Sequence, residues 1–346
     1  MVRSTFESLK NYDVENHLVV AKSKSQNSGK FDQDKLHYID QNRDQIYKII
    51  QQGKAELIKN TIIVSHGNWK FPSRLGHRLK KQGWPWIAYP HGMLEPWSMQ
   101  HKRWKKQLYF HLFENRFLKK ADRVVAVGRP EWENLKRQYK NSVLIPNGIA
   151  PFEGDIKKDN KKRIFLFLGR LHSKKCPFEL ASGWIGSSLK NQSSCRLVIA
   201  GPDEGEQNRI ESLISASGTK NIELAGPVYG EEKQKLLESA HFFLLPSQSE
   251  GFPTSILESM TFACVPVFSE GCNFPEAFEK KVAVEVKSDA NSIKNTLEEI
   301  VTWPNEVLET VGNSAKNFVD QNYSLEHIAR LQYDLYTQVL SQQINK

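Results

Sequence analysis

Short apolar segments alternate with amphipathic segments along almost the whole chain, and this alternation restricts the fold more than any other feature. Apolar runs such as residues 164–168 and 242–245 have the length and composition of buried strands. Strands that alternate with helices usually pair in parallel, with helices covering both faces of the sheet. The sequence therefore predicts an α/β protein with doubly wound parallel sheets.

The expected strands and helices can be placed individually. In the first half, strands are expected at residues 18–21, 61–65, 86–89, 123–127 and 143–145, and helices at 44–52, 102–119 and 131–137. In the second half, strands are expected at 163–168, 196–200, 221–224, 241–245 and 265–268, and helices at 177–187, 206–217, 231–239 and 255–262. Ligands of such sheets bind beyond the carboxyl ends of the strands, so functional residues are expected in the loops there.

The length of 346 residues favours two domains, because a single core seldom grows that large. The turn Pro146-Asn147-Gly148 and the charged segment after it, up to residue 162, mark the boundary. We therefore expect a first domain at 1–150 and a second at 151–323. A long helical pattern at 324–346 is expected to cross back to the first domain.

The net charge of +9 is compatible with nucleic acid, an anionic membrane surface or phosphorylated small molecules as partners. No RNP-type motif, zinc finger or basic zipper accompanies the charge, which argues against nucleic acid. The four cysteines form no CxxC pair and are expected to be reduced. No signal peptide is recognised at the start of the chain, so a cytoplasmic protein is expected.

The loop after the strand at 163–168 combines a glycine, two kinds of cation and a helix start. Gly169 ends the strand, Arg170 and Lys175 follow, and Pro177 suits the first turn of the next helix. A guanidinium, an ammonium and a helix N-terminus together suit a diphosphate. The alternative is an ordinary solvated basic loop.

The loop after the strand at 241–245 carries two acids. Glu250 lies in the loop, and Glu258 is expected in the first turn of a helix that Thr254 or Ser255 caps. Helical side chains lean toward the N-terminus, so Glu258 can reach the strand-end cleft and accept hydrogen bonds from a ribose diol. The alternatives are a helix-capping acid for Glu258 and a solvated loop acid for Glu250.

These motifs resemble those of a known enzyme family. Glu250 and Glu258, seven residues apart, resemble the E-x7-E signature of retaining GT-B-fold glycosyltransferases. Gly169-Arg170-Leu171, with a lysine five positions after the arginine, is similar to the phosphate loop of family 4 of these enzymes. The run from Tyr89 to Trp97 is similar to one found in members that build polysaccharides. The resemblance extends over nearly the whole chain.

The resemblance implies a GT-B architecture, in which two Rossmann-like domains face each other across a cleft. It implies that Arg170 and Lys175 neutralise the diphosphate leaving group, that Glu258 holds the ribose, and that Glu250 contacts the donor sugar. His91 would lie near the sugar and the acceptor; alternatively, it only satisfies backbone groups in a tight loop. The implied catalytic residues are His91, Arg170, Lys175 and Glu250, and the implied donor-binding residues are Gly169, Arg170, Lys175, Gly251, Phe252, Pro253, Thr254 and Glu258.

The implied activity is a retaining transfer from a UDP- or GDP-sugar to a glycan or lipid-linked acceptor in surface polysaccharide synthesis. Such enzymes need no cofactor and no catalytic metal, and no Asp-x-Asp motif stands at an expected strand end here. Two other activities on the same fold are a nucleotide-sugar epimerase and a sugar phosphorylase, although no pyridoxal motif supports the latter. A third hypothesis is a donor-binding scaffold without catalytic activity.

The chain departs from the family pattern at three places. The residues from Met1 to Ser4 resemble the helix that follows the first strand and its glycine-rich loop, so the first domain is expected to lack that strand. Cys176 stands where a glycine usually follows the lysine. Cys264 also stands where glycine is common, and a strained helix exit is expected there.

The segment from Lys102 to Lys120 combines cationic and aromatic residues. One hypothesis is an interfacial helix that rests on an anionic membrane, which would make the protein peripheral at the inner face of the cytoplasmic membrane. The other is an ordinary amphipathic helix that buries its aromatic side chains in the first domain.

Overall fold

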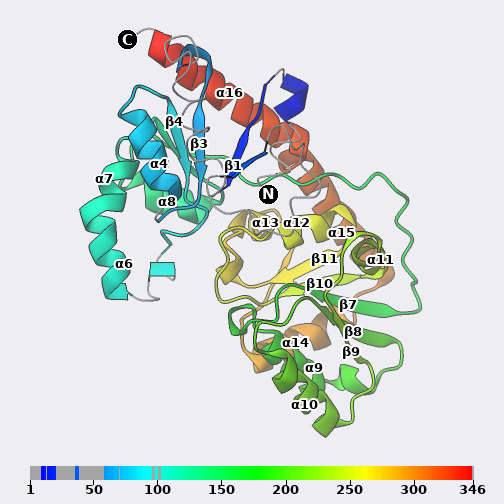
Figure 1. Cartoon of the computed structure of the whole chain (residues 1–346). Coiled ribbons are helices and arrows are strands. Elements are labelled where there is room, and N and C mark those ends of the chain that lie inside the picture. Colours follow the sequence, from blue (N-terminus) through cyan, green and yellow to red (C-terminus); the bar gives the residue numbers. More distant parts are fainter. Residues whose placement is uncertain are drawn as a thin grey trace. The chain divides into compact units, whose positions relative to one another are not determined.

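The structure of the protein is a computed structural model, and it describes residues 9–12, 14–20, 36–38, 58–69, 71–95, 98–99 and 103–344. The chain forms two compact units, which are treated separately below (Figure 1). Unit 1 comprises Met1–Val127, Glu131–Gly148 and Leu325–Lys346, and unit 2 comprises Gly128–Pro130 and Ile149–Ser324. By their contacts, the short segment Gly128–Pro130 is part of unit 2 and the last helix is part of unit 1.

Unit 1 contains a four-stranded parallel sheet in the order β3-β4-β5-β6 and a separate parallel pair, β1-β2. The strands are β1 (Leu18–Val20), β2 (Leu36–Tyr38), β3 (Ile63–His66), β4 (Trp86–Tyr89), β5 (Arg123–Ala126) and β6 (Ser142–Leu144). The helical elements are η1 (Leu9–Tyr12), α4 (Phe71–Lys80), α6 (Arg103–Tyr109), η3 (Phe110–Glu114), α7 (Asn115–Leu118), α8 (Arg129–Lys136) and α16 (Leu325–Ile344). The first two residues of α8 are assigned to unit 2 and the rest of the helix to unit 1.

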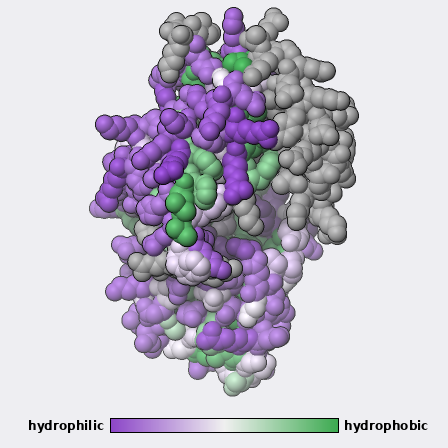
Figure 2. Space-filling view, turned by 60° about the vertical axis from the view of Figure 1, so that its left-hand side comes forward, coloured by the Kyte–Doolittle hydropathy of each residue, from purple (hydrophilic) through white to green (hydrophobic). Residues whose placement is uncertain are grey.

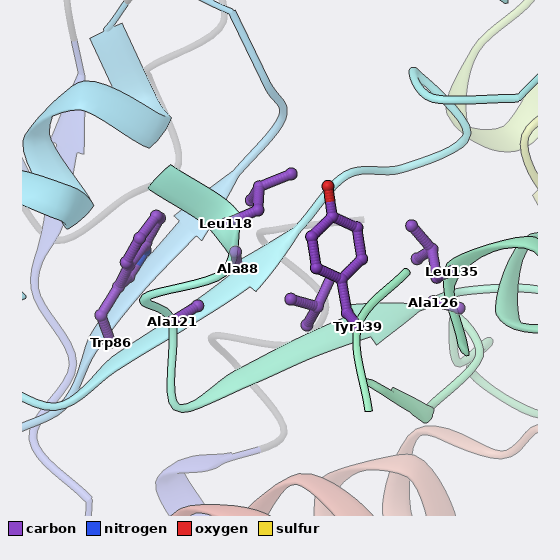
Figure 3. Close-up of a cluster of buried hydrophobic side chains, with 8 residues drawn as sticks. Trp86, Ala88, Leu118, Ala121, Ala126, Leu135 and Tyr139 are labelled. Atoms are coloured by element: carbon purple, nitrogen blue, oxygen red, sulfur yellow. The ribbon is translucent and has the colours of Figure 1, made fainter. Parts of the chain in front are cut away.

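The core of unit 1 lies between this sheet and its helices (Figure 3). Trp86 on β4 is fully buried, and its indole N–H donates to the Ser65 hydroxyl at 2.9 Å. A Cβ at Gly76 of α4 would lie 2.1 Å from the Trp86 ring, so only glycine lets the helix pack this closely. The cluster consists of Trp86, Ala88, Leu118, Ala121, Val124, Ala126, Leu135 and Tyr139.

Unit 2 contains a six-stranded parallel sheet in the order β12-β11-β10-β7-β8-β9. Read from the other edge, the strands appear third, second, first, fourth, fifth and sixth in chain order, which is the doubly wound pattern. The order reverses between β7 and β10, and this reversal is the topological switch point where such sheets bind ligands. The strands are β7 (Arg163–Leu168), β8 (Cys195–Ala200), β9 (Ile222–Gly226), β10 (Phe242–Leu245), β11 (Val265–Phe268) and β12 (Val284–Glu285).

Helices cover both faces of this sheet, with α9, α10 and α14 on one face and α11, α12 and α15 on the other (Figure 1). The two-sided cover explains why the central strands are apolar throughout: the Phe165 and Phe242 rings stack at 4.6 Å across the switch point. The helical elements are η4 (Ser173–Lys175), α9 (Pro177–Gly186), η5 (Ser188–Asn191), α10 (Gln207–Ser217), α11 (Gly230–Ser239), α12 (Thr254–Thr261), η6 (Glu270–Cys272), α13 (Pro275–Glu279), α14 (Ala290–Ile300) and α15 (Asn305–Asn322).

The predicted α/β class with two parallel sheets is confirmed, and β4, β7 and β11 begin and end where expected, at residues 86–89, 163–168 and 265–268. The strands β2 and β12 and the helices α4, α13, α14 and α15 were not predicted. The helix expected at 44–52, and the start of the chain on which the missing first strand was predicted, lie outside the described residues. Within the described ranges, no helix is both long and apolar enough to cross a bilayer.

Candidate functional site

The loops after β7 and β10 leave the sheet on either side of the switch point and contact each other. The Gln248 N–H donates to the Lys174 carbonyl at 2.9 Å, which joins the two loops by their backbones. The loop after β7 also contacts the one after β8, because the Leu171 N–H donates to the Pro202 carbonyl at 2.8 Å. The loops that follow the three neighbouring strands β10, β7 and β8 are thus connected by hydrogen bonds at the carboxyl edge of unit 2.

An ion pair lies where the first two loops meet. The Lys175 ammonium is 2.7 Å from Oε1 of Glu250, and only 13% and 16% of the two side chains are exposed. The Ser247 hydroxyl donates to the same oxygen at 2.9 Å. The Glu250 backbone is fixed as well: its N–H donates to the Gly271 carbonyl at 2.7 Å, and its carbonyl accepts from the Asn273 amide at 2.6 Å. The structure therefore brings two predicted catalytic residues together in a preorganised, half-desolvated pair.

Close backbone approach explains the glycines around this pair. A Cβ on Gly201 would lie 1.8 Å from the Gly169 carbonyl oxygen, and one on Gly169 would lie 3.1 Å from the Lys175 side chain. Gly201 must therefore stay glycine for the loops after β7 and β8 to touch. The Lys175 stem lies directly against Gly169.

Cys176 ends the lysine loop in the left-handed conformation, with φ at 55°. This conformation favours glycine, the residue that the family resemblance led us to expect at this point. Pro177 is the first residue of α9, as predicted. The free N–H groups at the start of α9 therefore lie directly after the two lysines of the loop.

Arg170 is placed differently from Lys175. Its guanidinium binds both oxygens of Glu204, at 2.8 and 2.7 Å, and 59% of its side chain is exposed. Glu204 follows β8, so the arginine is directed toward the third strand-end loop. The two predicted phosphate-binding cations thus share one loop but have different carboxylate partners.

The start of α12 corrects two sequence-based expectations. Pro253 is the residue that precedes the helix, and neither Thr254 nor Ser255 caps it with a side-chain hydrogen bond. Thr254 is the first helical residue, so Glu258 falls in the second turn rather than the first. The rigid ring of Pro253 sets the entry geometry that was expected from a hydroxyl cap.

Glu258 and Phe252 both have partners in unit 2. The Glu258 carboxylate forms an ion pair with Lys233 of α11, with 25% of the glutamate side chain exposed. Phe252 is buried and its ring packs edge to face on Phe274 at 5.3 Å. The aromatic ring is therefore part of the core, which leaves the backbone of the Gly251-Phe252-Pro253 segment for ligand contact.

In unit 1, His91 follows β4 and adopts a left-handed backbone, with φ at 54°. Its Nε2 lies 2.9 Å from Nδ1 of His66, the last residue of β3. Burial lowers the pKa of His91 to about 3 and that of His66 to about 4, so both imidazoles are neutral at physiological pH. The loop that holds His91 is itself anchored, because the Gly92 N–H donates to the buried Glu131 carboxylate at 2.6 Å.

Several residues around these side chains were not singled out from the sequence. Ser247 and Asn273 hold Glu250, Glu204 binds Arg170, Lys233 binds Glu258, and His66 contacts His91. Glu204 and His66 carried a usable signal, since His66 directly follows an expected strand and Glu204 lies in the loop after another. In the part of the chain that the structure describes, no group of three or more His, Cys, Asp or Glu side chains is arranged to hold a metal ion.

Family models match most of the chain. Residues 29–151 match the model described as Glycosyltransferase Family 4, and residues 151–318 match the model described as Glycosyl transferases group 1. The two matches meet at residue 151, next to the change from unit 1 to unit 2. The ion pair of Lys175 and Glu250 lies in the group 1 match, and the imidazole pair lies in the family 4 match.

Individual proteins agree with these models. The chain is 23% identical over 219 residues to the GDP-mannose:cellobiosyl-diphosphopolyprenol alpha-mannosyltransferase of Xanthomonas oryzae pv. oryzae (strain PXO99A), covering 60% of this chain and 56% of that protein. The fold of the present chain is similar to that of a sucrose-phosphate synthase from Thermosynechococcus elongatus, with a TM-score of 0.71 and 18% identity. The match covers 99% of this chain and 93% of the synthase. It is also similar to the Anabaena protein HepE in complex with UDP and glucose, with a TM-score of 0.67, 14% identity, and coverage of 88% and 86%.

Proposed function

Since this chain belongs to the GT-B glycosyltransferases, with a family 4 first domain and a group 1 second domain, we propose that it transfers a sugar from a UDP- or GDP-sugar to a glycan or lipid-linked acceptor. The observation that carries the proposal is the largely buried ion pair of Lys175 and Glu250, 13% and 16% exposed, at the switch point of unit 2. The relative from Xanthomonas is named for transfer to a cellobiosyl-diphosphopolyprenol, which supports a lipid-linked acceptor. A role in surface polysaccharide synthesis is part of the same proposal.

The strand-end loops of unit 2 supply the chemistry that a nucleoside diphosphate leaving group needs. Lys175 provides an ammonium in a partly desolvated position, where its charge interacts strongly with developing negative charge on a phosphate oxygen. Arg170, in the same loop, adds a planar guanidinium that exchanges Glu204 for phosphate oxygens. We propose that these two cations allow catalysis without a divalent metal.

Glu250 has a second role in this scheme. Ser247 and Lys175 both donate to its Oε1, which fixes the orientation of the carboxylate before any ligand binds. A fixed carboxylate beside the diphosphate site is well placed to accept hydrogen bonds from donor-sugar hydroxyls. We propose retention of the anomeric configuration, with Glu258 holding the ribose through an exchange of its Lys233 contact.

Incubation of the purified protein with UDP- and GDP-sugars tests this proposal. We expect release of UDP or GDP that persists in EDTA and is lost in Lys175→Met. The matched control is Arg196→Met, which removes a cation from an exposed ion pair on β8 and should leave release unchanged. Tight nucleotide binding without release would establish a scaffold instead, and conversion of the donor sugar to its epimer would establish an epimerase.

We also propose that α6, η3 and α7 rest on an anionic membrane surface. Trp104, Leu108, Leu112 and Phe113, here called the apolar strip, are 68%, 55%, 45% and 45% exposed. Exposed lysines flank the strip at Lys105, Lys119 and Lys120. On the face that Figure 2 brings forward, apolar side chains are bordered by hydrophilic ones. Apolar residues bordered by cations have the chemistry of an anionic lipid interface.

The alternative of an ordinary core-facing helix accounts for only part of this segment. Phe110 and Leu118 are buried in unit 1, while Trp104 and Phe113 are not. Sedimentation with lipid vesicles tests the membrane contact: binding to vesicles with anionic lipid is expected, and Trp104→Ser with Leu108→Ser should abolish it. Tyr229→Ser, which changes an equally exposed aromatic residue of unit 2, is the control. Equal binding of all variants would contradict the proposal.

A further inference from the structure

The two histidines at the carboxyl edge of unit 1 are held together by neighbouring parallel strands. β3 and β4 pair in a register that places His66 opposite Tyr89, and the chain after Tyr89 turns so that His91 returns toward His66. The Gly67 N–H donates to the Tyr89 carbonyl at 2.8 Å, which extends the pairing one residue beyond β3. The contact between the imidazoles therefore follows from the sheet and is not a chance approach of two loops.

The three rings of this edge lie close together and nearly parallel. The centroids of His66 and Tyr89 are 5.0 Å apart, those of His66 and His91 are 5.2 Å apart, and the two imidazole planes differ by 18°. These contacts leave each imidazole little freedom to rotate. The left-handed backbone of His91, with φ at 54°, is a strained conformation for a non-glycine residue, and the ring contacts give a reason for it to persist.

The nitrogen contact couples the protons of the two rings. Each neutral imidazole carries one proton, and the 2.9 Å contact between Nδ1 of His66 and Nε2 of His91 needs one proton between these atoms. If His66 donates, both rings carry their proton on Nδ1; if His91 donates, both carry it on Nε2. The contact therefore allows only arrangements in which the two rings have the same tautomer.

The other nitrogen of His91 is the one left for a ligand. Within the described residues, His91 Nδ1 is buried and has no hydrogen-bond partner. A buried polar atom without a partner requires an explanation, and a catalytic role or a bound water is among the recognised ones. Whether Nδ1 donates or accepts there is decided by the proton on the His66 side of the ring.

We infer that His66 is a positioning residue, which orients the His91 ring and fixes whether its Nδ1 donates a proton to the substrate or accepts one from it. This inference rests on the proposed function in assigning His91 to the substrate side. Its geometric part, the coupling of the two tautomers, is independent of catalysis. His66 itself touches no reacting atom in this scheme.

NMR spectroscopy of protein labelled with 15N-histidine, at near-neutral pH, tests the inference. We expect His66 and His91 each to show one neutral tautomer, the same in both rings. His66→Phe should move the His91 nitrogens toward a mixture of tautomers, and His66→Asn should restore a single one, because its amide can serve the same hydrogen bond. The signals are assigned by their loss in His91→Gln. Opposite tautomers in the two rings, or unchanged His91 signals in His66→Phe, would overturn the inference.

Kinetics separates positioning from a structural effect. His66→Phe should lower kcat about tenfold with little change in the KM of the donor, and His66→Asn should recover most of the loss. Loss of turnover while the His91 tautomer stays unchanged would contradict a positioning role. Should His66→Phe fail to fold, the wild-type tautomers and His66→Asn still decide the question. Because the spectra need no donor, they hold even where the proposed transfer activity fails.

Discussion

At the carboxyl edge of unit 2, a lysine forms an ion pair with a glutamate at 2.7 Å. At the carboxyl edge of unit 1, a hydrogen bond of 2.9 Å joins the nitrogens of two uncharged imidazoles. Both edges are the ends of parallel strands, and both use a residue in the left-handed conformation, Cys176 in unit 2 and His91 in unit 1. The same architecture thus carries full charges in one unit and neutral rings in the other. Charges suit an anionic diphosphate, and neutral rings suit a hydroxyl group.

The largest effect is expected at the charged edge. Lys175→Met should raise the barrier to transfer by about 2–4 kcal/mol, which slows the reaction roughly 30- to 900-fold, because a cation on the leaving group is lost. Arg170→Ala should lose less, since its guanidinium is largely exposed and already paired. The measurement is kcat/KM with the best donor, and near-wild-type turnover in both variants would reject the diphosphate assignment.

The neutral edge predicts a pH dependence of stability. His91 and His66 have pKa values lowered to about 3 and about 4, so the folded state resists protonation that the unfolded state accepts. Stability is therefore full above about pH 6.5 and falls as the pH drops toward 4, by up to about 1.4 kcal/mol per pH unit for each histidine. The free energy of unfolding, measured with urea at several pH values, should show this slope. In His91→Gln the slope should be smaller by up to about 1.4 kcal/mol per pH unit, because one titrating histidine is removed. An equal slope in both proteins would show that these rings are not buried as neutral groups.

Glu258 tests which part of the donor the charged edge holds. Glu258→Gln should weaken nucleoside diphosphate binding about tenfold with a smaller effect on turnover, because a charged hydrogen-bond acceptor is replaced by a neutral one. Titration calorimetry with UDP and GDP measures the change. Lys233→Met is the companion variant, since it removes the present partner of Glu258 without touching the carboxylate. If Glu258→Gln leaves the nucleotide affinity unchanged, Glu258 only forms the structural ion pair with Lys233 and does not bind the ribose.

A substitution at Glu204 tests whether this carboxylate competes with the diphosphate for the Arg170 guanidinium. Glu204→Gln removes the charge that binds the guanidinium in the unliganded protein. Exposed ion pairs contribute up to about 1 kcal/mol, so nucleoside diphosphate affinity should rise by about two- to fivefold. Calorimetry again gives the value. A weaker affinity would mean that Glu204 helps to place Arg170 for the ligand.

The smallest effect is expected at Cys176. Cys176→Gly relieves a left-handed conformation that costs about 1 kcal/mol, but it also removes a fully buried thiol. The two changes nearly cancel, so the midpoint of thermal unfolding should stay within a few degrees and donor binding should be retained. Collapse of donor binding would give the thiol a role in the loop that its geometry does not indicate.

The sequence predicted the fold well where strands are continuous apolar runs, as at β7 and β11, because burial on both faces leaves a clear signal. It missed β2, which has three residues, and α4, whose Pro72 and Gly76 are typical helix breakers. Gly76 is required by the Trp86 ring, and that packing exists only in three dimensions.

The candidate site, like the fold, could be predicted only in part from the sequence. The sequence placed Lys175 and Glu250 in two strand-end loops, where ligands of such sheets bind, but it did not predict their ion pair. The partners Glu204, Lys233 and His66 lie 34, 25 and 25 residues from the residues they contact, and no spacing rule connects them. The strained exit expected at Cys264 lies one residue earlier, at Ala263, whose φ is 49°. The roles assigned to the individual site residues stay predictions until these variants are measured.

The central claim is that the strand-end loops of unit 2 bind the diphosphate of a nucleotide sugar through Lys175. Calorimetric titration of UDP and GDP into the wild type, Lys175→Met and the control Arg196→Met tests it most directly. We predict saturable binding of at least one nucleotide to the wild type and the control, and at least about tenfold weaker binding to Lys175→Met. Equal affinity of the wild type and Lys175→Met, or binding of UMP and GMP as tight as that of UDP and GDP, would contradict the account.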